Sequence, residues 1–288
     1  MKTILKRVVM VTGGIIVILP LCVFLASQWR LHKTYDVALT PLRVDTVSIG
    51  VEQGRHIAQI SGCIGCHHAN GNVLFEAPGI GHLVAPNLTR VAPTYSDAEL
   101  ARLIRRGVKR DGRSAVAMPA ASFAALSDAD VAAIIVWLRS EPRQPDAQPA
   151  GTSWGPLGHV AIAIGKVPFS ADMVAANFVS DAPPPLRRPS ATPAQEGAYL
   201  VKTICSHCHE LDVEHDDGWG TIAPPLRMMG QAYPLNEFRH LLRTGKGMGD
   251  RELGLMSSVA RGDLSHMTDP EIEAIHAYLN ATELQASE

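Results

Sequence analysis

The sequence predicts an all-α chain in which two tandem modules follow an N-terminal transmembrane helix. Three observations predict this fold class: a long apolar run opens the chain, the string C-x-x-C-H occurs twice, and each copy is followed by an amphipathic pattern that closes in a capped helix. At 288 residues the chain is long for one domain and sufficient for two. The predicted boundaries are 1–30 for a membrane anchor, 31–47 for a tether, 48–140 for the first module, 141–192 for a Pro-rich connector and 193–285 for the second module.

The apolar run extends from Val8 to Trp29 and contains no charged side chain. As a helix with a rise of about 1.5 Å per residue, a run of this length suffices to cross a bilayer core. Positive residues at Lys2, Lys6 and Arg7 predict a cytoplasmic N-terminus, so the two modules are expected on the periplasmic side of a bacterial inner membrane. A cleaved signal peptide is the alternative, although its apolar region is typically shorter, about 7 to 15 residues.

The two C-x-x-C-H strings are the strongest functional signal. They comprise Cys63, Cys66 and His67 in the first module, and Cys205, Cys208 and His209 in the second. In such a string the two thiols can form thioethers to the vinyl groups of a haem, and the histidine is placed to ligate its iron. A zinc site or a dithiol redox motif is the alternative, but neither explains a histidine directly after each second cysteine. The strings therefore predict two covalently bound haem c groups.

Composition limits the other function classes. The strings use four of the five cysteines and leave only Cys22, which lies in the apolar run, so no thiol remains in the modules for a disulfide. The net charge of -2 gives no reason to expect nucleic acid as a partner. Aromatic residues make up only 5% of the chain, and two porphyrins would supply the missing apolar bulk.

An internal repeat surrounds the two strings. Ala85-Pro86-Asn87-Leu88 matches Ala223-Pro224-Pro225-Leu226, and a glycine follows the leucine at the same distance in both modules, at Gly107 and Gly245. Each module is predicted to close with a capped helix, at 127–138 and 268–279.

Two glycines near the module starts predict helix crossings. Gly54 is expected to let its helix approach the last helix of the first module at Trp137, and Gly197 to do the same at Tyr278 in the second. Between the modules, residues 141–195 hold ten prolines and predict an extended connector. The apolar piece 157–169 within it is expected to form a short helix docked at the interface between the modules, and a membrane-associated segment, too short to span a bilayer, is the alternative.

Methionine is the leading candidate for the second axial ligand of each iron. Met118 follows Gly107 at the same spacing at which Met256 follows Gly245. A lone methionine more often fills core space, but the shared spacing in both repeats favours ligation. Met248 and Met267 are alternatives in the second module, where the stretch from the methionine to the cap is longer than in the first. Ligation by a second histidine, such as His68, His82, His207 or His266, is a further alternative.

Other groups around each haem can be predicted by position in the repeat. The carbonyls of Pro86 and Pro224 are candidates to accept a hydrogen bond from the second ring nitrogen of His67 and His209, and plain turn prolines are the alternative. The candidate donors to the haem propionates are Arg105, Arg110, Arg113 and Trp219. For each of them an ordinary surface residue is the alternative.

These motifs resemble those of tandem di-haem c-type cytochromes. The resemblance is carried by C-x-x-C-H, by A-P-N-L-T at 85–89, by I-R-R-G-V-K-R-D-G-R at 104–113 with Met118-Pro119, and by S-D-A-D-V at 127–131. The first module is similar to the cytochrome c subunits of bacterial membrane-bound alcohol, aldehyde and gluconate dehydrogenases. The resemblance implies an all-helical cytochrome c fold in each module and electron flow from a dehydrogenase through the haems to ubiquinone or an oxidase. Those subunits commonly carry three haem motifs, whereas this chain has two.

The expected function is single-electron transfer by a membrane-anchored di-haem cytochrome c in a periplasmic respiratory chain, without catalytic activity of its own. Its expected partners are redox proteins: a dehydrogenase, an oxidase or a small electron carrier. A haem subunit of a dehydrogenase or a cbb-type oxidase complex is the alternative. A di-haem peroxidase or thiosulfate-oxidising enzyme would need an open or unusually ligated iron, and a gas sensor would need Met118 or Met256 to leave on reduction.

Overall fold

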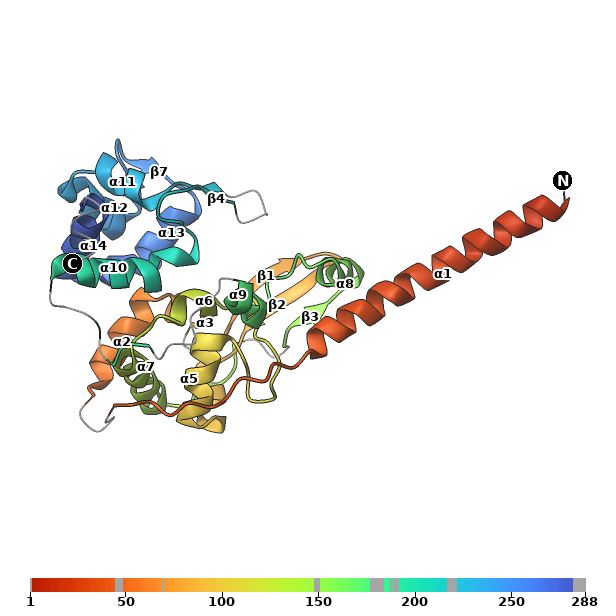
Figure 1. The fold of residues 1–288 in the computed structure, drawn as a ribbon, viewed down its shortest axis with the longest axis horizontal. Coiled ribbons are helices and arrows are strands. Elements are labelled where there is room, and N and C mark those ends of the chain that lie inside the picture. Colours follow the sequence, from red (N-terminus) through yellow and green to blue (C-terminus); the bar gives the residue numbers. More distant parts are fainter. Residues whose placement is uncertain are drawn as a thin grey trace.

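The computed structural model describes residues 2–44, 49–68, 70–147, 151–176, 184–186, 188, 192–216 and 222–281. Two mostly helical lobes lie side by side, and one long helix projects away from the first of them (Figure 1). The expectation of an all-α chain needs correction, because short strands occur in both lobes and in the connector.

The projecting helix is α1 (Lys2–His32), which contains Pro20. Its outer part carries exposed apolar side chains, among them Ile16, Val17 and Leu25. Across the residues that the structure describes, no helix combines the length and the apolarity needed to cross a membrane. After α1 the chain runs along the first lobe: the Tyr35 amide donates to the carbonyl of Gly112 at 2.9 Å.

The first lobe begins with the segment that holds the first haem motif and ends in a capped helix. Its elements are α2 (Val51–Ile60), α3 (Cys63–His67), β1 (Asn72–Ala77), β2 (Gly81–Ala85), α4 (Leu88–Val91), η2 (Ala92–Thr94), α5 (Asp97–Arg106), α6 (Ala120–Phe123) and α7 (Asp128–Ser140). The antiparallel hairpin β1–β2 was not predicted. It forms because Gly79 and Gly81 adopt positive φ and turn the chain back between two stretches that extend readily.

The second lobe repeats the helical part of this order. Its elements are α10 (Pro193–Thr203), η3 (Cys205–His207), β4 (His215–Asp216), β5 (Ile222–Ala223), α11 (Leu226–Ala232), α12 (Leu235–Thr244), β6 (Lys246–Gly247), β7 (Arg251–Glu252), α13 (Leu255–Gly262), η4 (Leu264–His266) and α14 (Asp269–Asn280). Thr268 and Glu271 form a capping box at the start of α14, and Ser127 caps α7, so both predicted terminal helices are confirmed.

Both predicted helix crossings are also confirmed. A Cβ atom on Gly54 would lie 1.9 Å from the carbonyl oxygen of Ala133 and 2.8 Å from Cβ of Trp137. The same atom on Gly197 would lie 2.0 Å from the carbonyl oxygen of Ala274 and 2.8 Å from Cβ of Tyr278. Only glycine permits these helices to approach so closely.

The connector contains β3 (Ser153–Trp154), α8 (Pro156–Ala163) and α9 (Ser170–Ala176). The prediction that the 157–169 piece docks between the modules is wrong. β3 extends the hairpin sheet, and α8 packs against α1, where Oγ of Ser27 lies 2.7 Å from Nδ1 of His159. The small residues of α8 allow close packing on the hairpin as well: a Cβ on Gly158 would lie 2.1 Å from the carbonyl oxygen of Ile80.

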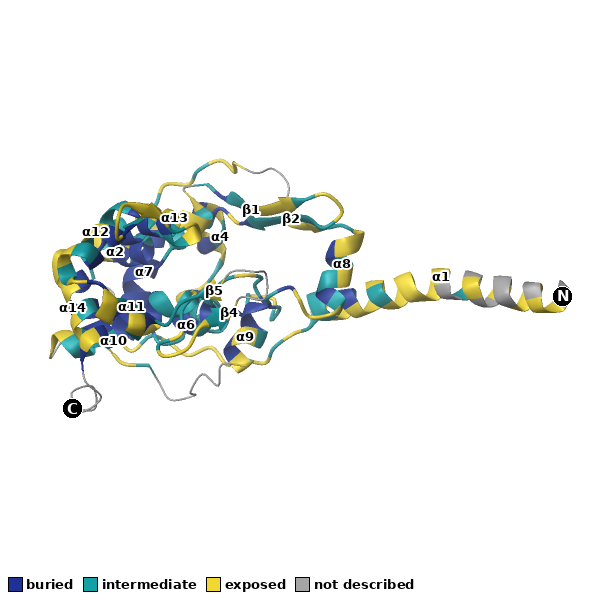
Figure 2. Cartoon of the chain, turned by 90° about the horizontal axis from the view of Figure 1, so that it is seen from above, coloured by how far each residue is buried: buried dark blue, intermediate teal, exposed yellow. Residues whose placement is uncertain are grey.

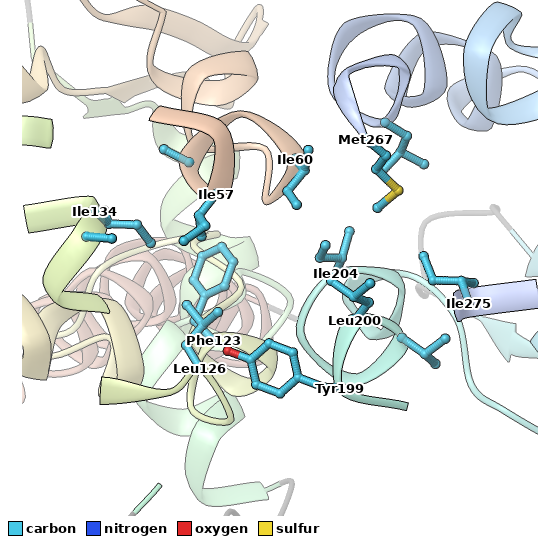
Figure 3. Close-up of a cluster of buried hydrophobic side chains, with 14 of the residues drawn as sticks. Ile57, Ile60, Phe123, Leu126, Ile134, Tyr199, Leu200, Ile204, Met267 and Ile275 are labelled. Carbon is cyan, nitrogen blue, oxygen red and sulfur yellow. The ribbon is translucent and has the colours of Figure 1, made fainter. Parts of the chain in front are cut away.

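A single apolar cluster joins the two lobes. Figure 3 shows Ile60 of α2 on the side toward Leu200, Ile204 and Met267 of the second lobe, while Ile57 lies beside Phe123 of the first lobe. In Figure 2 the buried residues gather in the lobes, away from the outer part of α1. The lobes therefore share one core across their interface.

Buried polar groups reinforce that interface. The Tyr199 hydroxyl of α10 donates to Asp130 of α7 at 2.5 Å and accepts from the amide of Ser127 at 2.9 Å. Nε2 of His56 in α2 lies 3.0 Å from both carboxylate oxygens of Glu271 in α14. Arg188 of the connector lies 2.9 Å from the same carboxylate. These contacts fix the lobes at several points.

Candidate haem sites

The first C-x-x-C-H string forms a short helical turn directly after α2. Gly62 adopts the left-handed conformation, with φ of 77°, and lets the chain reverse into α3. The Cys66 amide then donates to the carbonyl of Gly62 at 3.1 Å. Burial raises the pKa of the Cys63 thiol to about 12, with smaller contributions from Cys66 and Asp263. Cysteines three apart on a helical turn lie on one side of it, which suits attachment to a single flat group.

The second string has a tighter turn of the same kind. η3 follows α10, and the amides of Cys208 and His209 both donate to the carbonyl of Cys205, at 3.2 and 3.1 Å. Burial raises the pKa of Cys205 to about 12, as it does for Cys63. The first cysteine of each string is thus the more deeply enclosed one.

The two histidines have the same neighbour in both lobes. Nδ1 of His67 lies 2.8 Å from the carbonyl oxygen of Pro86, and Nδ1 of His209 lies 2.9 Å from that of Pro224. A carbonyl can only accept, so each Nδ1 carries a proton, and in a neutral ring Nε2 then keeps its lone pair. Burial lowers the pKa of His67, which favours the neutral ring. An iron ligand needs that tautomer, and the role of these contacts at an iron stays a prediction.

Met118 lies on a loop that the connector holds. Ala117 has a positive φ of 59°, which is rare for a residue with a Cβ, and its amide donates to the carbonyl of Pro168 at 2.8 Å. The Met118 amide donates to Oγ of Ser170 at 3.2 Å. The Met118 side chain is half-buried against the core cluster that also receives Cys63.

The three methionines considered for the second iron lie in different surroundings. Met256 is half-buried in α13 and packs on the same core cluster as Cys205. Met248 is 38% exposed, and Met267 is 2% exposed inside the core. Met267 directly precedes the Thr268 cap, as Leu126 precedes the Ser127 cap, so its position is that of a core residue in the first lobe.

Comparison with known proteins assigns both lobes. Residues 50–138 match the family model for subunit III of cbb3-type cytochrome c oxidase, and residues 194–283 match the model for cytochrome c. The chain carries two cytochrome c domains. Two such domains imply two covalent haem c groups, and the paired thiols with a correctly protonated histidine in each domain fit that group.

Several relatives are named as cytochrome subunits of dehydrogenases. The chain is 26% identical over 270 residues to the gluconate 2-dehydrogenase cytochrome c subunit of Pantoea cypripedii, covering 80% of this chain and 59% of the relative. It is 25% identical over 299 residues to the cytochrome c subunit of the quinone alcohol dehydrogenase of Gluconacetobacter polyoxogenes, covering 90% and 60%. It is 22% identical to the fructose dehydrogenase cytochrome subunit of Gluconobacter japonicus, covering 82% and 53%. The chain thus spans little more than half the length of these relatives, and it is a distantly related di-haem cytochrome c.

The arginines suggested for the haem propionates have protein partners in the first cytochrome c domain. Arg105 donates to the carbonyl of Leu126 at 2.7 Å and to Asp128 at 2.9 Å. Arg110 donates to the carbonyl of Thr94, and Arg113 pairs with Asp111. In the second domain Arg243 repeats the role of Arg105 with Asp269, at 2.7 Å. Each of these arginines therefore stabilises its own domain, and Trp219 lies outside the described residues.

Two contacts near the haem strings were not predicted from the sequence, because they cross the domain interface. The Asp263 carboxylate of the second domain lies against the first string, where a Cβ on Gly65 would be 2.6 Å from its Oδ1. Among the described residues, that buried Oδ1 has no hydrogen-bond partner. His207 of the second string packs edge-on against Phe123 of the first domain, with ring centroids 4.9 Å apart. Burial lowers the pKa of His207 to about 4, so its ring is neutral.

Proposed function

We propose that this chain passes single electrons between a dehydrogenase and a further redox protein, from a membrane-attached position on the periplasmic side. One observation carries the proposal: the same histidine-to-carbonyl contact occurs in two cytochrome c domains that share one core. Two sites in one rigid body suit a relay, because the distance between them is constant. The relatives named as dehydrogenase cytochrome subunits supply the class of partner.

The residues that would hold the two haems follow from the repeat. Cys63 and Cys66 would form the thioethers of the first group, and His67 and Met118 would be its axial ligands. Cys205, Cys208, His209 and Met256 would do the same for the second. A haem with histidine and methionine ligands supplies fast one-electron exchange without an open position for oxygen. The protein contributes the fixed imidazoles through Pro86 and Pro224.

Membrane attachment would come through α1. Its uncharged run at 8–29 and its exposed apolar side chains, including Ile16, Val17 and Leu25, favour contact with lipid. Lys2, Lys6 and Arg7 before the run favour a cytoplasmic N-terminus, which would place both cytochrome c domains in the periplasm.

The ligand assignment is tested by spectroscopy of the ferric protein. The long-wavelength charge-transfer band of methionine-ligated haem should be present, and Met118→Ala and Met256→Ala should each remove about half of it. Met248→Ala should leave the band intact, because that side chain is partly exposed on a different turn. Carbon monoxide binding to both ferrous haems of the unaltered protein would contradict the electron-carrier proposal.

The partner is tested by purification from detergent-solubilised membranes. A dehydrogenase that co-purifies and reduces both haems when its substrate is added is the expected result. The match of residues 50–138 to an oxidase subunit model favours a second candidate, a haem subunit of a terminal oxidase. Co-purification of an oxidase that oxidises the reduced chain would support this candidate over the first.

A further inference from the structure

Helix α8 has three faces, and one of them is apolar and uncovered. Gly158 and Ile162 face inward and are buried, and His159 faces α1. Leu157 and Val160 of α8 and its C-cap residue Ile164 lie at helical spacing on the remaining side, and they are 59%, 39% and 67% exposed. No residue of α8 is Asp, Glu, Lys or Arg. A short helix without any charge that exposes three aliphatic side chains on one face is unusual for a water-exposed surface.

The uncovered face continues the apolar surface of α1. His159 of α8 contacts both Ser27 and Phe24 of α1, the latter with ring centroids 5.2 Å apart. In Figures 1 and 2, α8 lies at the end of the first domain from which α1 emerges, and it runs across the base of α1. If α1 enters a bilayer along its own axis, α8 lies flat at the surface of that bilayer.

Basic side chains surround this junction. Arg30 lies beside the last turn of α8, where a Cβ on Gly165 would be 3.5 Å from its guanidinium. Lys166 follows the helix and is exposed, and Lys33 follows α1. Asp172 pairs with two of these cations, at 2.8 Å from Lys33 and 3.6 Å from Arg30. Basic side chains beside an apolar helix face are complementary to anionic lipid headgroups.

We propose that α8 is an interfacial helix whose Leu157, Val160 and Ile164 face lies in the headgroup region of the bilayer beside α1. The proposal rests on the membrane attachment through α1 proposed above and adds a second point of contact. Two contacts on different elements fix orientation, whereas one helix alone leaves the domains free to turn about it.

The second contact would set how the first haem site faces the membrane. Leu157 packs on Gly79 at the tip of the β1–β2 hairpin, where a Cβ would lie 3.3 Å from its side chain. That hairpin starts shortly after His67 and ends directly before Pro86, whose carbonyl holds His67. The β1–β2 hairpin therefore links α8 to both His67 and Pro86, the two partners of the contact that orients the histidine.

The experiment compares spin labels on the full-length, haem-containing protein with Cys22→Ser as background. Leu157→Cys and Leu255→Cys are a matched pair, since both leucines are 59% exposed and Leu255 lies on α13 of the second domain. Val17→Cys reports on α1, and Ile164→Cys has the same 67% exposure as Val17. The protein is reconstituted into phosphatidylethanolamine–phosphatidylglycerol vesicles, and collisions of each label with oxygen and with a water-soluble nickel chelate are measured by electron paramagnetic resonance.

We expect the oxygen-to-nickel collision ratio at positions 17, 157 and 164 to be several-fold higher than at position 255. A ratio at 157 and 164 as low as at 255, with a high ratio at 17, would overturn the α8 proposal and leave the α1 anchor standing. A low ratio at position 17 as well would overturn both. Labels at 157 and 164 that are shielded only when a co-purified protein partner is present would overturn the lipid contact, because a protein would then cover this face.

Discussion

The two cytochrome c domains differ most in what covers the turn before the candidate methionine ligand. In both domains a helix ends at a left-handed glycine, Gly107 or Gly245, and a buried serine lies over it. A Cβ on Gly107 would be 2.4 Å from Cβ of Ser170, and a Cβ on Gly245 would be 2.4 Å from the carbonyl oxygen of Ser257. Ser257 belongs to α13 of the same domain, whereas Ser170 belongs to α9 of the connector.

The first domain therefore takes from the connector a part that the second domain supplies itself. Residues 168–171 contribute the acceptors for the amides of Ala117 and Met118. They lie outside the range 50–138 that matches a cytochrome family model. A first domain cut at residue 140 would lack the support of its methionine loop, whereas the second domain would retain its own.

The largest expected effect concerns the glycine helix crossing that each domain contains. Gly54→Ala and Gly197→Ala each force a Cβ to within about 2 Å of a backbone carbonyl, so the packed helices must separate. We expect each variant to lower the free energy of unfolding by roughly 3 kcal/mol or more. Urea unfolding followed by circular dichroism measures the change.

Gly50→Ala is the control for those substitutions, because a Cβ there meets no atom of the described residues within 4 Å. It should change the free energy of unfolding by less than about 0.5 kcal/mol. A large loss for Gly54→Ala together with a small one for Gly197→Ala would show that the second helix pair is packed less tightly than its partner.

The next effect concerns the contact between the domains. Burial alone would raise the pKa of Glu271, but the His56 side chain, the Thr268 amide and Arg188 together lower it to about 2. Glu271→Gln keeps an acceptor for the helix cap and removes the charge, so we expect a loss of roughly 3 kcal/mol. Glu99 also completes a capping box, but its ion pair is with the exposed Arg110 of the same domain at 3.5 Å, so Glu99→Gln should cost clearly less than Glu271→Gln.

The lowered pKa of Glu271 also gives a pH dependence. A carboxylate whose pKa is below its ordinary 4.5 stabilises the fold fully above that pH, and the contribution is lost as the pH falls toward 2. The unaltered protein should therefore lose interdomain contact between pH 4.5 and 2, seen as an increased radius of gyration in small-angle X-ray scattering. Glu271→Gln should show a smaller change over that range, and an equal change would mean that other carboxylates dominate.

Features that occur in both modules could be predicted from the sequence, whereas contacts between distant segments of the chain could not. The glycine crossings and the terminal caps follow from local spacing, since both partners lie in matched positions of the two modules. The hairpin, the docking of α8 on α1 and the cover supplied by Ser170 depend on long-range packing that occurs once, so no second copy could indicate them. Ligation by Met118 and Met256 stays a prediction.

Substitution of the two serines, Ser170 and Ser257, tests this difference between the domains. Oγ of Ser257 donates to the carbonyl of Gly245 at 2.5 Å and accepts from the amide of Leu253 at 2.7 Å. Oγ of Ser170 accepts from the amide of Met118 at the longer distance of 3.2 Å. We expect Ser257→Ala to cost about 2 kcal/mol and Ser170→Ala about 1 kcal/mol, because two short buried bonds are lost in the first case and one long bond in the second.

Each serine variant should also loosen one methionine loop, which is measured as carbon monoxide binding to the reduced protein. Both are expected to bind more than the unaltered chain, and Ser257→Ala more than Ser170→Ala. Ser258→Ala is the control, since that neighbouring side chain is exposed. Greater binding in Ser170→Ala would mean that the connector, and not α13, is the stronger support.

The smallest expected effect concerns the reduction potential of the first haem, which a carboxylate of the second domain is expected to lower. The Asp263 carboxylate lies against Gly65 inside the first haem string. Burial raises the pKa of Asp263, so the carboxylate is charged only at a pH above that raised pKa. A negative charge near a haem favours ferric iron. At an effective dielectric of about 20, one charge near a site contributes about 1 kcal/mol, or some tens of millivolts.

Asp263→Asn should therefore raise one of the two reduction potentials in a spectroelectrochemical titration and leave the other in place. The exposed Asp250→Asn should shift neither, because that carboxylate lies near His240 on the surface of the second domain. Equal shifts of both potentials in Asp263→Asn would mean that the carboxylate acts on the two haems alike, and the domains would then be less distinct electrostatically than their packing makes them.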